Sequence, residues 1–272
     1  RREGRYDVAE ALVEEALELA RQGEDHPRVF TSMSLLGEIY SRQGRYREAE
    51  PLLTESVARD RTLFGHYELY NVNPLAELYE EQDKYTEAEK WFKEAIQSGK
   101  EQSRAEHPET LRAINGLGRV LSKQERYEEA KLTFKDALNK GRNRLGPEHP
   151  EVLESMNELG VLYTIRGQYE EAHRLISDVL QARDKKLGAD HPDTLESKND
   201  LALLYKEEAR YDEAESLLIE ALEGRRRKLG DQHPHTLESR NSLIELYEAW
   251  DKPERAEQWR ARLSRSQDAE GR

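Results

Sequence analysis

The sequence predicts an all-α protein, a solenoid in which antiparallel helix hairpins stack one against the next. Two observations predict this class. The dipeptide His-Pro recurs at a fixed interval of 42 residues, at His107, His149, His191 and His233, with an earlier copy at His26. An internal period of this length is typical of repeat architectures. Hydrophobic residues are only 36% of the 272 residues and charged residues another 36%, which fits thin ordered units that cover one another better than one thick core.

A recurring alanine defines the units in order along the chain. Its copies are Ala9, Ala49, Ala88, Ala130, Ala172, Ala214 and Ala256. A tyrosine lies three residues before each of the first six, and Pro253 takes its place in the seventh. Thirteen residues before each of the last six lies a leucine, followed by Gly37, Ala76, Gly118, Gly160, Ala202 or Ile244. The distance from an alanine to the next leucine varies between 26 and 29 residues, so we expect length changes in the connection between units.

Each unit is predicted to form two helices. In the copy that follows His191, apolar residues recur at helical spacing up to Tyr205 and again after a turn near Glu208 to Tyr211. Proline suits the first turn of a helix, so His-Pro predicts the start of each first helix, with the histidine or the residue before it as the cap. Cations such as Arg225 before Gly230 predict the end of each second helix, because they complement the helix dipole. The small residue beside each leucine predicts where paired helices cross.

These elements divide the chain into three parts. We expect residues 1–22 to be the second helix of a truncated first repeat, 26–264 to be six hairpins in one solenoid, and 265–272 to be a polar tail. The Asn73-Pro74 pair predicts a kink or a late start of the first helix in its unit. The chain starts without Met, in the middle of a unit, and we expect it to be a part of a longer protein.

The repeated residues resemble a known family. The pattern Leu-Ala-x-x-Tyr followed by Tyr-x-x-Ala, present as Leu201, Ala202, Tyr205, Tyr211 and Ala214, resembles the tetratricopeptide repeat. The segment from His191 to Ala202 resembles the extended 42-residue repeats of kinesin light chains and related bacterial arrays. The resemblance implies a right-handed superhelix whose first helices line a concave groove. It is specific for the fold and weak for function, because such arrays serve many proteins.

Several classes of function are excluded or disfavoured by composition. The chain has no Cys, so disulfides, thiol chemistry and Cys-bound metals are excluded. That composition fits a reducing compartment, and we expect a cytoplasmic location. No uncharged stretch is long enough to span a bilayer. A net charge of −13 opposes binding to nucleic acid. No catalytic or metal motif is present, and most histidines belong to the His-Pro signal, so we expect neither enzymatic activity in this segment nor a cofactor.

An asparagine ladder is the first candidate site on the predicted groove. Asparagine recurs at one position in five units, as Asn73, Asn115, Asn157, Asn199 and Asn241. Each could hydrogen-bond to the neighbouring helix and fix the register of the stack. Each could also offer a donor and an acceptor to the backbone of an extended peptide. The sequence leaves both interpretations open.

Charge along the same face is the second candidate feature. The unit with Asn115 contributes Arg112, Arg119 and Lys123 and no acid. The last three units contribute only Lys206 against eight acids, Glu154, Glu158, Glu196, Asp200, Glu207, Glu238, Glu245 and Glu248. Solvated helix faces would explain such charges, but two like-charged blocks on one face would also steer a partner.

Together these features predict a protein-protein interaction scaffold that binds a peptide or protein segment of mixed or basic charge in the concave groove. The alternative is a regulatory or self-association module of a larger signalling protein, such as a bacterial protein kinase, because similar arrays are often joined to signalling domains. The sequence does not identify the partner.

Overall fold

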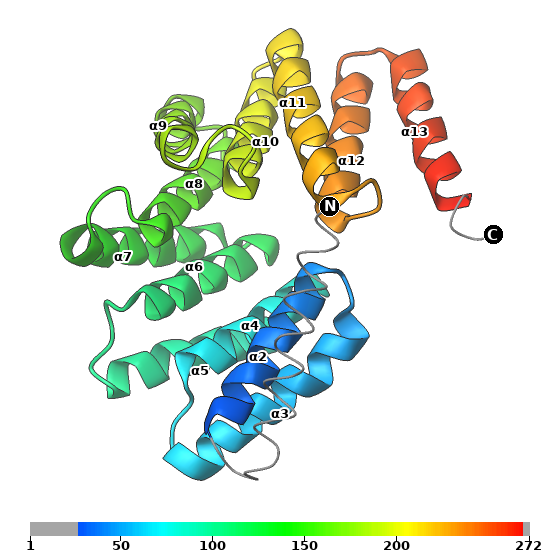
Figure 1. Ribbon diagram of the computed structural model, residues 1–272. Coiled ribbons are helices and arrows are strands. Elements are labelled where there is room, and N and C mark those ends of the chain that lie inside the picture. The colour runs from blue at the N-terminus through cyan, green and yellow to red at the C-terminus, as the bar shows by residue number, and fades with distance from the viewer. Residues whose placement is uncertain (1–26, 269–272) are drawn as a thin grey trace. The chain divides into compact units, whose positions relative to one another are not determined.

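The structure is a computed structural model that describes residues 27–268, and it is all-α over that range (Figure 1). The predicted helix within residues 1–22 lies outside the described residues. The first helices of the hairpins are α2 (Pro27–Arg42), α4 (Leu69–Glu81), α6 (Pro108–Lys123), α8 (Pro150–Ile165), α10 (Pro192–Glu207) and α12 (Pro234–Ala249). The second helices are α3 (Tyr46–Phe64), α5 (Tyr85–Glu101), α7 (Tyr127–Leu145), α9 (Tyr169–Leu187), α11 (Tyr211–Leu229) and α13 (Pro253–Asp268).

The chain forms two compact units, residues 1–155 and 156–272, and the division falls inside α8. In the first unit α2 packs on α3, α4 on α5 and α6 on α7, and successive first helices α2, α4 and α6 also contact one another. In the second unit α10 packs on α11 and α12 on α13, and α10 contacts α12. Each unit is therefore a stack of antiparallel hairpins, as the repeat predicts. The helix α13 extends to Asp268, four residues into the segment expected to be a tail.

The proline of a His-Pro dipeptide begins every first helix except α4, and at four of these helices the histidine itself is the cap. At α6, α8, α10 and α12 the ring Nδ1 of the histidine accepts a hydrogen bond from the backbone N–H two residues later, at 3.3 Å in each case. A side-chain acceptor at this position satisfies one of the free N–H groups of the first helical turn. The histidines therefore have a local structural role.

The turn inside each hairpin contains one residue in the left-handed region. It is Gly44, Asp83, Glu125, Gly167, Ala209 or Asp251, with φ between 55° and 76°. Glycine adopts this conformation without cost, whereas a residue with a Cβ is strained there by about 1 kcal/mol. The backbone thus imposes the same turn on every hairpin, whatever residue the sequence supplies.

Small residues let the two helices of a hairpin approach closely. A Cβ placed on Gly118 would lie 2.4 Å from a ring carbon of Phe134, and one on Gly160 would lie 2.6 Å from Ile176. Phe134 and Ile176 are fully buried. The prediction that these glycines mark helix crossings is confirmed, because no larger residue fits between the paired helices.

The helix α4 starts late, as the Asn73-Pro74 pair predicts. It has 13 residues where α6, α8, α10 and α12 have 16, and the missing residues are its first turn. Pro74 has no N–H to donate to the Tyr70 carbonyl four residues earlier. The Ser34 hydroxyl of α2 donates to that carbonyl instead, at 3.0 Å. The shortening of this unit therefore falls within the helix, and the connection before it remains four residues long.

Candidate peptide-binding surface

The predicted site residues all lie on first helices, and in each unit we call the face of these helices that carries them the first-helix surface. In the first unit α4 and α6 present Asn73, Arg112, Asn115, Arg119 and Lys123, with Glu154 at the start of α8. In the second unit this surface includes Asn157 and Glu158 from α8 and residues of α10 and α12. The two parts are described separately below.

In the first unit the asparagines of the ladder form hydrogen bonds between neighbouring hairpins. Asn115 is buried, and its Nδ2 donates to the backbone carbonyl of Glu151 at 3.0 Å. Its Oδ1 accepts from the Ser155 hydroxyl at 2.7 Å. Asn73 is also buried and donates to the backbone carbonyl of Glu109 at 2.8 Å. These two amides therefore join each first helix to the N-terminal turn of the next, as the register interpretation requires.

Asn73 lacks the second half of this arrangement. Its Oδ1 is buried without a hydrogen-bond partner. The residue one repeat before Ser155 is Ala113, which has no hydroxyl to donate. The Oδ1 atom of Asn73 therefore has no hydrogen-bond donor, because the neighbouring helix lacks the serine hydroxyl at this position.

The asparagines of the second unit differ from those of the first. Asn157 is buried and donates to Asp200 Oδ2 at 2.6 Å, while its Oδ1 accepts from Ser197 at 3.3 Å. The Oδ1 atom of Asn199 is buried without a partner. Asn241 lies on α12 with its side chain exposed. Of the five, Asn241 is the one whose amide is openly accessible.

In the second unit two buried arginines make the hydrogen bonds that join one hairpin to the next. Reasoning from the sequence did not identify this role. Arg183 Nη1 donates to the Asp193 carbonyl at 3.1 Å and to Ser197 at 2.8 Å. Arg225 Nη1 donates in the same way to the carbonyl of His235 and to its neighbouring serine, at 2.9 Å each. Both side chains are at most 6% exposed. The sequence predicts a helix-end role for Arg225, yet in the structure both arginines tie a second helix to the next first helix.

The basic block of the first unit is neutralised by acids from neighbouring helices. Arg112 makes a bidentate pair with Glu77 of α4, at 2.5 and 2.6 Å, and reaches Glu38 of α2 at 3.2 Å. Arg119 makes a bidentate pair with Glu80 at 2.8 and 2.9 Å and contacts Glu154 at 3.3 Å. Counting charges within one repeat misses the two bidentate pairs, because Glu77 and Glu80 come from the preceding repeat.

Lys123 completes this block and differs from the two arginines. Its side chain is exposed at the end of α6, and no ion pair to it is found among residues 27–268. It is therefore the most accessible of the three predicted cations.

The acidic trough of the second unit is mostly exposed to solvent. The side chains of Glu238 and Glu245 are about 60% exposed, and that of Glu196 is half exposed. Lys206 lies 3.5 Å from Glu245 and 3.8 Å from Glu207, so one cation is shared by two acids. Glu248 pairs with Arg260 of α13. The face of α10 and α12 thus presents more carboxylates than cations.

Two carboxyl groups of this surface have raised pKa values. Desolvation raises the pKa of Asp200 to about 6, against the opposing effects of the Asn157 hydrogen bond and of Arg183 and Arg225. Desolvation, with repulsion from Glu154, raises the pKa of Glu151 to about 7. Both groups sit where helices pack closely, and their charge is costly at neutral pH.

Comparison with known sequences identifies the family. Tetratricopeptide repeats match residues 1–62, 67–143, 152–193 and 194–235. The chain therefore belongs to the tetratricopeptide repeat family. Comparison with curated protein sequences gives no match.

Solved structures are similar to the chain over most of its length. A putative kinesin light chain of P. anserina, with nearly identical TPR-like repeats, is 28% identical, covers 75% of this chain and 98% of its own, and has a TM-score of 0.55. BtubC (BKLC) from P. vanneervenii is 22% identical, with 83% and 92% coverage and a TM-score of 0.64. NprR in complex with its cognate peptide NprX is 16% identical, with 93% and 72% coverage and a TM-score of 0.71. The resemblance to kinesin light chain repeats is thereby confirmed.

Two further observations concern residues 27–268. None of their helices combines the length and the apolar character needed to cross a membrane. Within the same range, no three histidine or acidic side chains cluster as metal ligands would.

Proposed function

We propose that this chain is a protein-protein interaction scaffold that binds a peptide or protein segment on its first-helix surface. The family supports this, since each repeat presents one helix of its hairpin in series with those of its neighbours. A structural neighbour, NprR, is described in complex with a cognate peptide, and the fold is shared with it. The observation on which the proposal depends most is the exposed acidic face of α10 and α12.

This face favours a partner with basic residues. Glu196, Glu238 and Glu245 expose their carboxylates, and the nearest cation on the face, Lys206, is already shared. Arg183 and Arg225 contact two of these acids but lie buried beneath them. Long-range attraction between this face and a basic segment would speed association and weaken as salt rises.

The partner is proposed to be acidic where it meets the first unit, and Lys123 is the group most open to it. Arg112 and Arg119 would have to exchange Glu77 and Glu80 for a partner carboxylate, and bidentate pairs of this kind are strong. Backbone pairing by the asparagine ladder is proposed mainly for Asn241, because the amides of Asn73 and Asn115 are occupied between hairpins.

A peptide array tests this proposal. Arrays of systematically varied charge would be probed with the chain, and the best binder measured by surface plasmon resonance at low and moderate salt. We expect basic peptides to bind, and Glu245→Lys to slow their association about tenfold at low salt. Asp178→Lys is the matched control, because Asp178 is an exposed acid on the second helix α9. Equal effects of the two substitutions, or binding independent of salt, would contradict the proposal.

The regulatory alternative predicts a different partner. A signalling domain of the same parent chain would then occupy the surface, and the isolated chain would bind that domain in preference to any array peptide. The sequence of the complete parent gene identifies the domain to be tested.

A further inference from the structure

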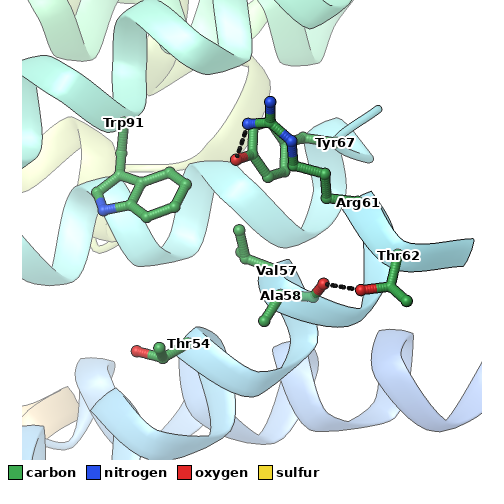
Figure 2. Close-up of a pocket in the computed structure, with 7 residues that line it drawn as sticks. All are labelled: Thr54, Val57, Ala58, Arg61, Thr62, Tyr67 and Trp91. Carbon is green, nitrogen blue, oxygen red and sulfur yellow. Dashed lines mark hydrogen bonds between the residues drawn. The ribbon is translucent and has the colours of Figure 1, made fainter. Parts of the chain in front are cut away.

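A pocket of about 340 Å³ lies between α3 and α5, on the second-helix side of the first unit (Figure 2). The pocket does not belong to the first-helix surface, because its walls come from second helices and one connection. Those walls are Thr54, Val57, Ala58, Arg61 and Thr62 of α3, Tyr67 of the connection, and Trp91 of α5. Its volume is at the lower end of the range for ligand sites and suits one bulky group.

The pocket is preformed because Tyr67 is held firmly. Tyr67 stands where other units have the first turn of a first helix, which α4 lacks. Its carbonyl accepts from the Ser98 hydroxyl at 2.6 Å and from the Gln102 amide at 3.1 Å. Its ring meets Trp91 edge-on, with centroids 5.7 Å apart. A site whose walls are already ordered loses little entropy on binding.

The inner surface of the pocket is largely apolar. The phenol oxygen of Tyr67 accepts from Arg61 Nη1 at 2.8 Å, and Thr62 donates to the Ala58 carbonyl at 3.0 Å (Figure 2). With these polar groups engaged, the walls offer the Val57 methyls, the Ala58 methyl and two aromatic rings. Such a lining favours an aliphatic or aromatic side chain over a polar one.

Two cations lie near the aromatic rings of the pocket. The Arg61 guanidinium lies 5.3 Å from the Tyr67 ring centroid, and the Lys90 ammonium lies 5.1 Å from that of Trp91. Both side chains are exposed, and over residues 27–268 neither forms an ion pair within 4 Å. Glu94 and Glu101 act on Arg61 at longer range. A carboxylate beside Arg61, which belongs to the pocket lining, would gain an attractive contact.

We propose that this pocket docks a segment of a partner protein in which a bulky apolar side chain is next to an acidic residue. The apolar side chain fills the pocket, and the carboxylate lies beside Arg61. Leu63 and Phe64, on the last turn of α3, are exposed large apolar residues that add to the area such a segment could cover.

A display selection with a blocked variant tests this site. A random-peptide library is selected in parallel on the chain and on Ala58→Phe, whose added ring fills the pocket from an exposed position on α3. We expect the native chain to enrich peptides with an aromatic or large aliphatic residue beside Asp or Glu, and the blocked variant to lose them. In fluorescence polarisation, the best synthetic peptide should bind Ala58→Phe at least about tenfold more weakly.

Two further variants separate charge recognition from unfolding. Arg61→Gln should weaken the peptide about threefold or more and reduce its salt dependence. Arg59→Gln, an exposed cation of the same helix outside the pocket lining, should stay within about twofold of native affinity. Glu245→Lys should have no effect, which distinguishes this site from the first-helix surface. The proposal is overturned if no peptide depends on the open pocket, or if the enriched anchors are flanked by Lys or Arg.

Discussion

The unpaired Oδ1 atom of Asn73 allows a direct test of the hydrogen bonds that join one hairpin to the next. Replacing Ala113 by Ser adds one hydroxyl at the position that Ser155 occupies one repeat later. In that repeat the hydroxyl donates to Asn115 Oδ1 at 2.7 Å and lies 2.8 Å from the carbonyl of Glu151. At position 113 the new hydroxyl would reach Asn73 Oδ1 in the same way. Ala113→Ser should therefore stabilise the protein.

The magnitude follows from the cost of an unsatisfied buried group. Leaving a buried acceptor unpaired costs about 1–3 kcal/mol, whereas a typical hydrogen bond contributes a net 0.5–1.5 kcal/mol. Because the hydroxyl adds little volume, we expect a gain of about 1 kcal/mol, which raises Tm by about 2–4 °C for a chain of this size.

Urea denaturation followed by circular dichroism, together with thermal melting, measures this gain. The reverse change, Ser155→Ala, is the matched control and should lower stability by about 1–2 kcal/mol, since it leaves Asn115 Oδ1 unpaired. A loss of stability in Ala113→Ser, or no effect in either variant, would show that these amide carbonyls do not need the serine.

Three other substitutions follow from the structure. In urea titrations, Glu151→Gln should stabilise the protein by about 1–3 kcal/mol at pH 8 and have little effect at pH 4. The reason is that the pKa of Glu151 is raised to about 7 in the native state. The native state therefore binds a proton more readily than the unfolded state, and wild-type stability falls as the pH rises from 4.5 to 7. Ala209→Gly should raise stability by about 0.5–1 kcal/mol because residue 209 has φ of 59°, and Gly167→Ala should lower it, both by thermal melting. Arg225→Met should cost about 2–4 kcal/mol through the buried groups it leaves unpaired, whereas the exposed Arg226→Met should be near neutral.

The fold was largely predictable because its signals are local. The His-Pro dipeptide, the small residue at each crossing and the alanine after each turn act within one hairpin, and their spacing in the sequence is their spacing in the helix. The late start of α4 was predictable for the same reason. Its compensation was not, because the Ser34 hydroxyl that replaces the missing hydrogen bond comes from a different hairpin.

The charge of the candidate surface was harder to predict for a related physical reason. Helical spacing tells which residues share one helix face, but it does not tell which faces touch. Arg112 and Arg119 make their bidentate pairs with Glu77 and Glu80 of the preceding repeat, which lie within hydrogen-bond distance in the structure. Exposed Lys123 and Glu245 could be placed from the sequence, since their position depends on one helix alone.

The joint between hairpins shows how one backbone requirement is met by different side chains. The N-terminal turn of each new first helix presents a carbonyl that needs a donor. Where the preceding second helix has a glycine, as at Gly141, the asparagine of the previous first helix donates to it. Where that position holds an arginine, as at Arg183, the guanidinium donates to the carbonyl instead, and the amide of Asn157 donates to Asp200. At Gly141 the side chain of Val152 packs against the glycine, and a Cβ there would lie 2.6 Å from it. The residue at this position therefore changes the groups with which the asparagine of the ladder pairs, and Asn199, which precedes the carbonyl bound by Arg225, is left with an unpartnered carbonyl oxygen. The hydrogen-bond partners of the ladder asparagines thus depend on residues of the second helices.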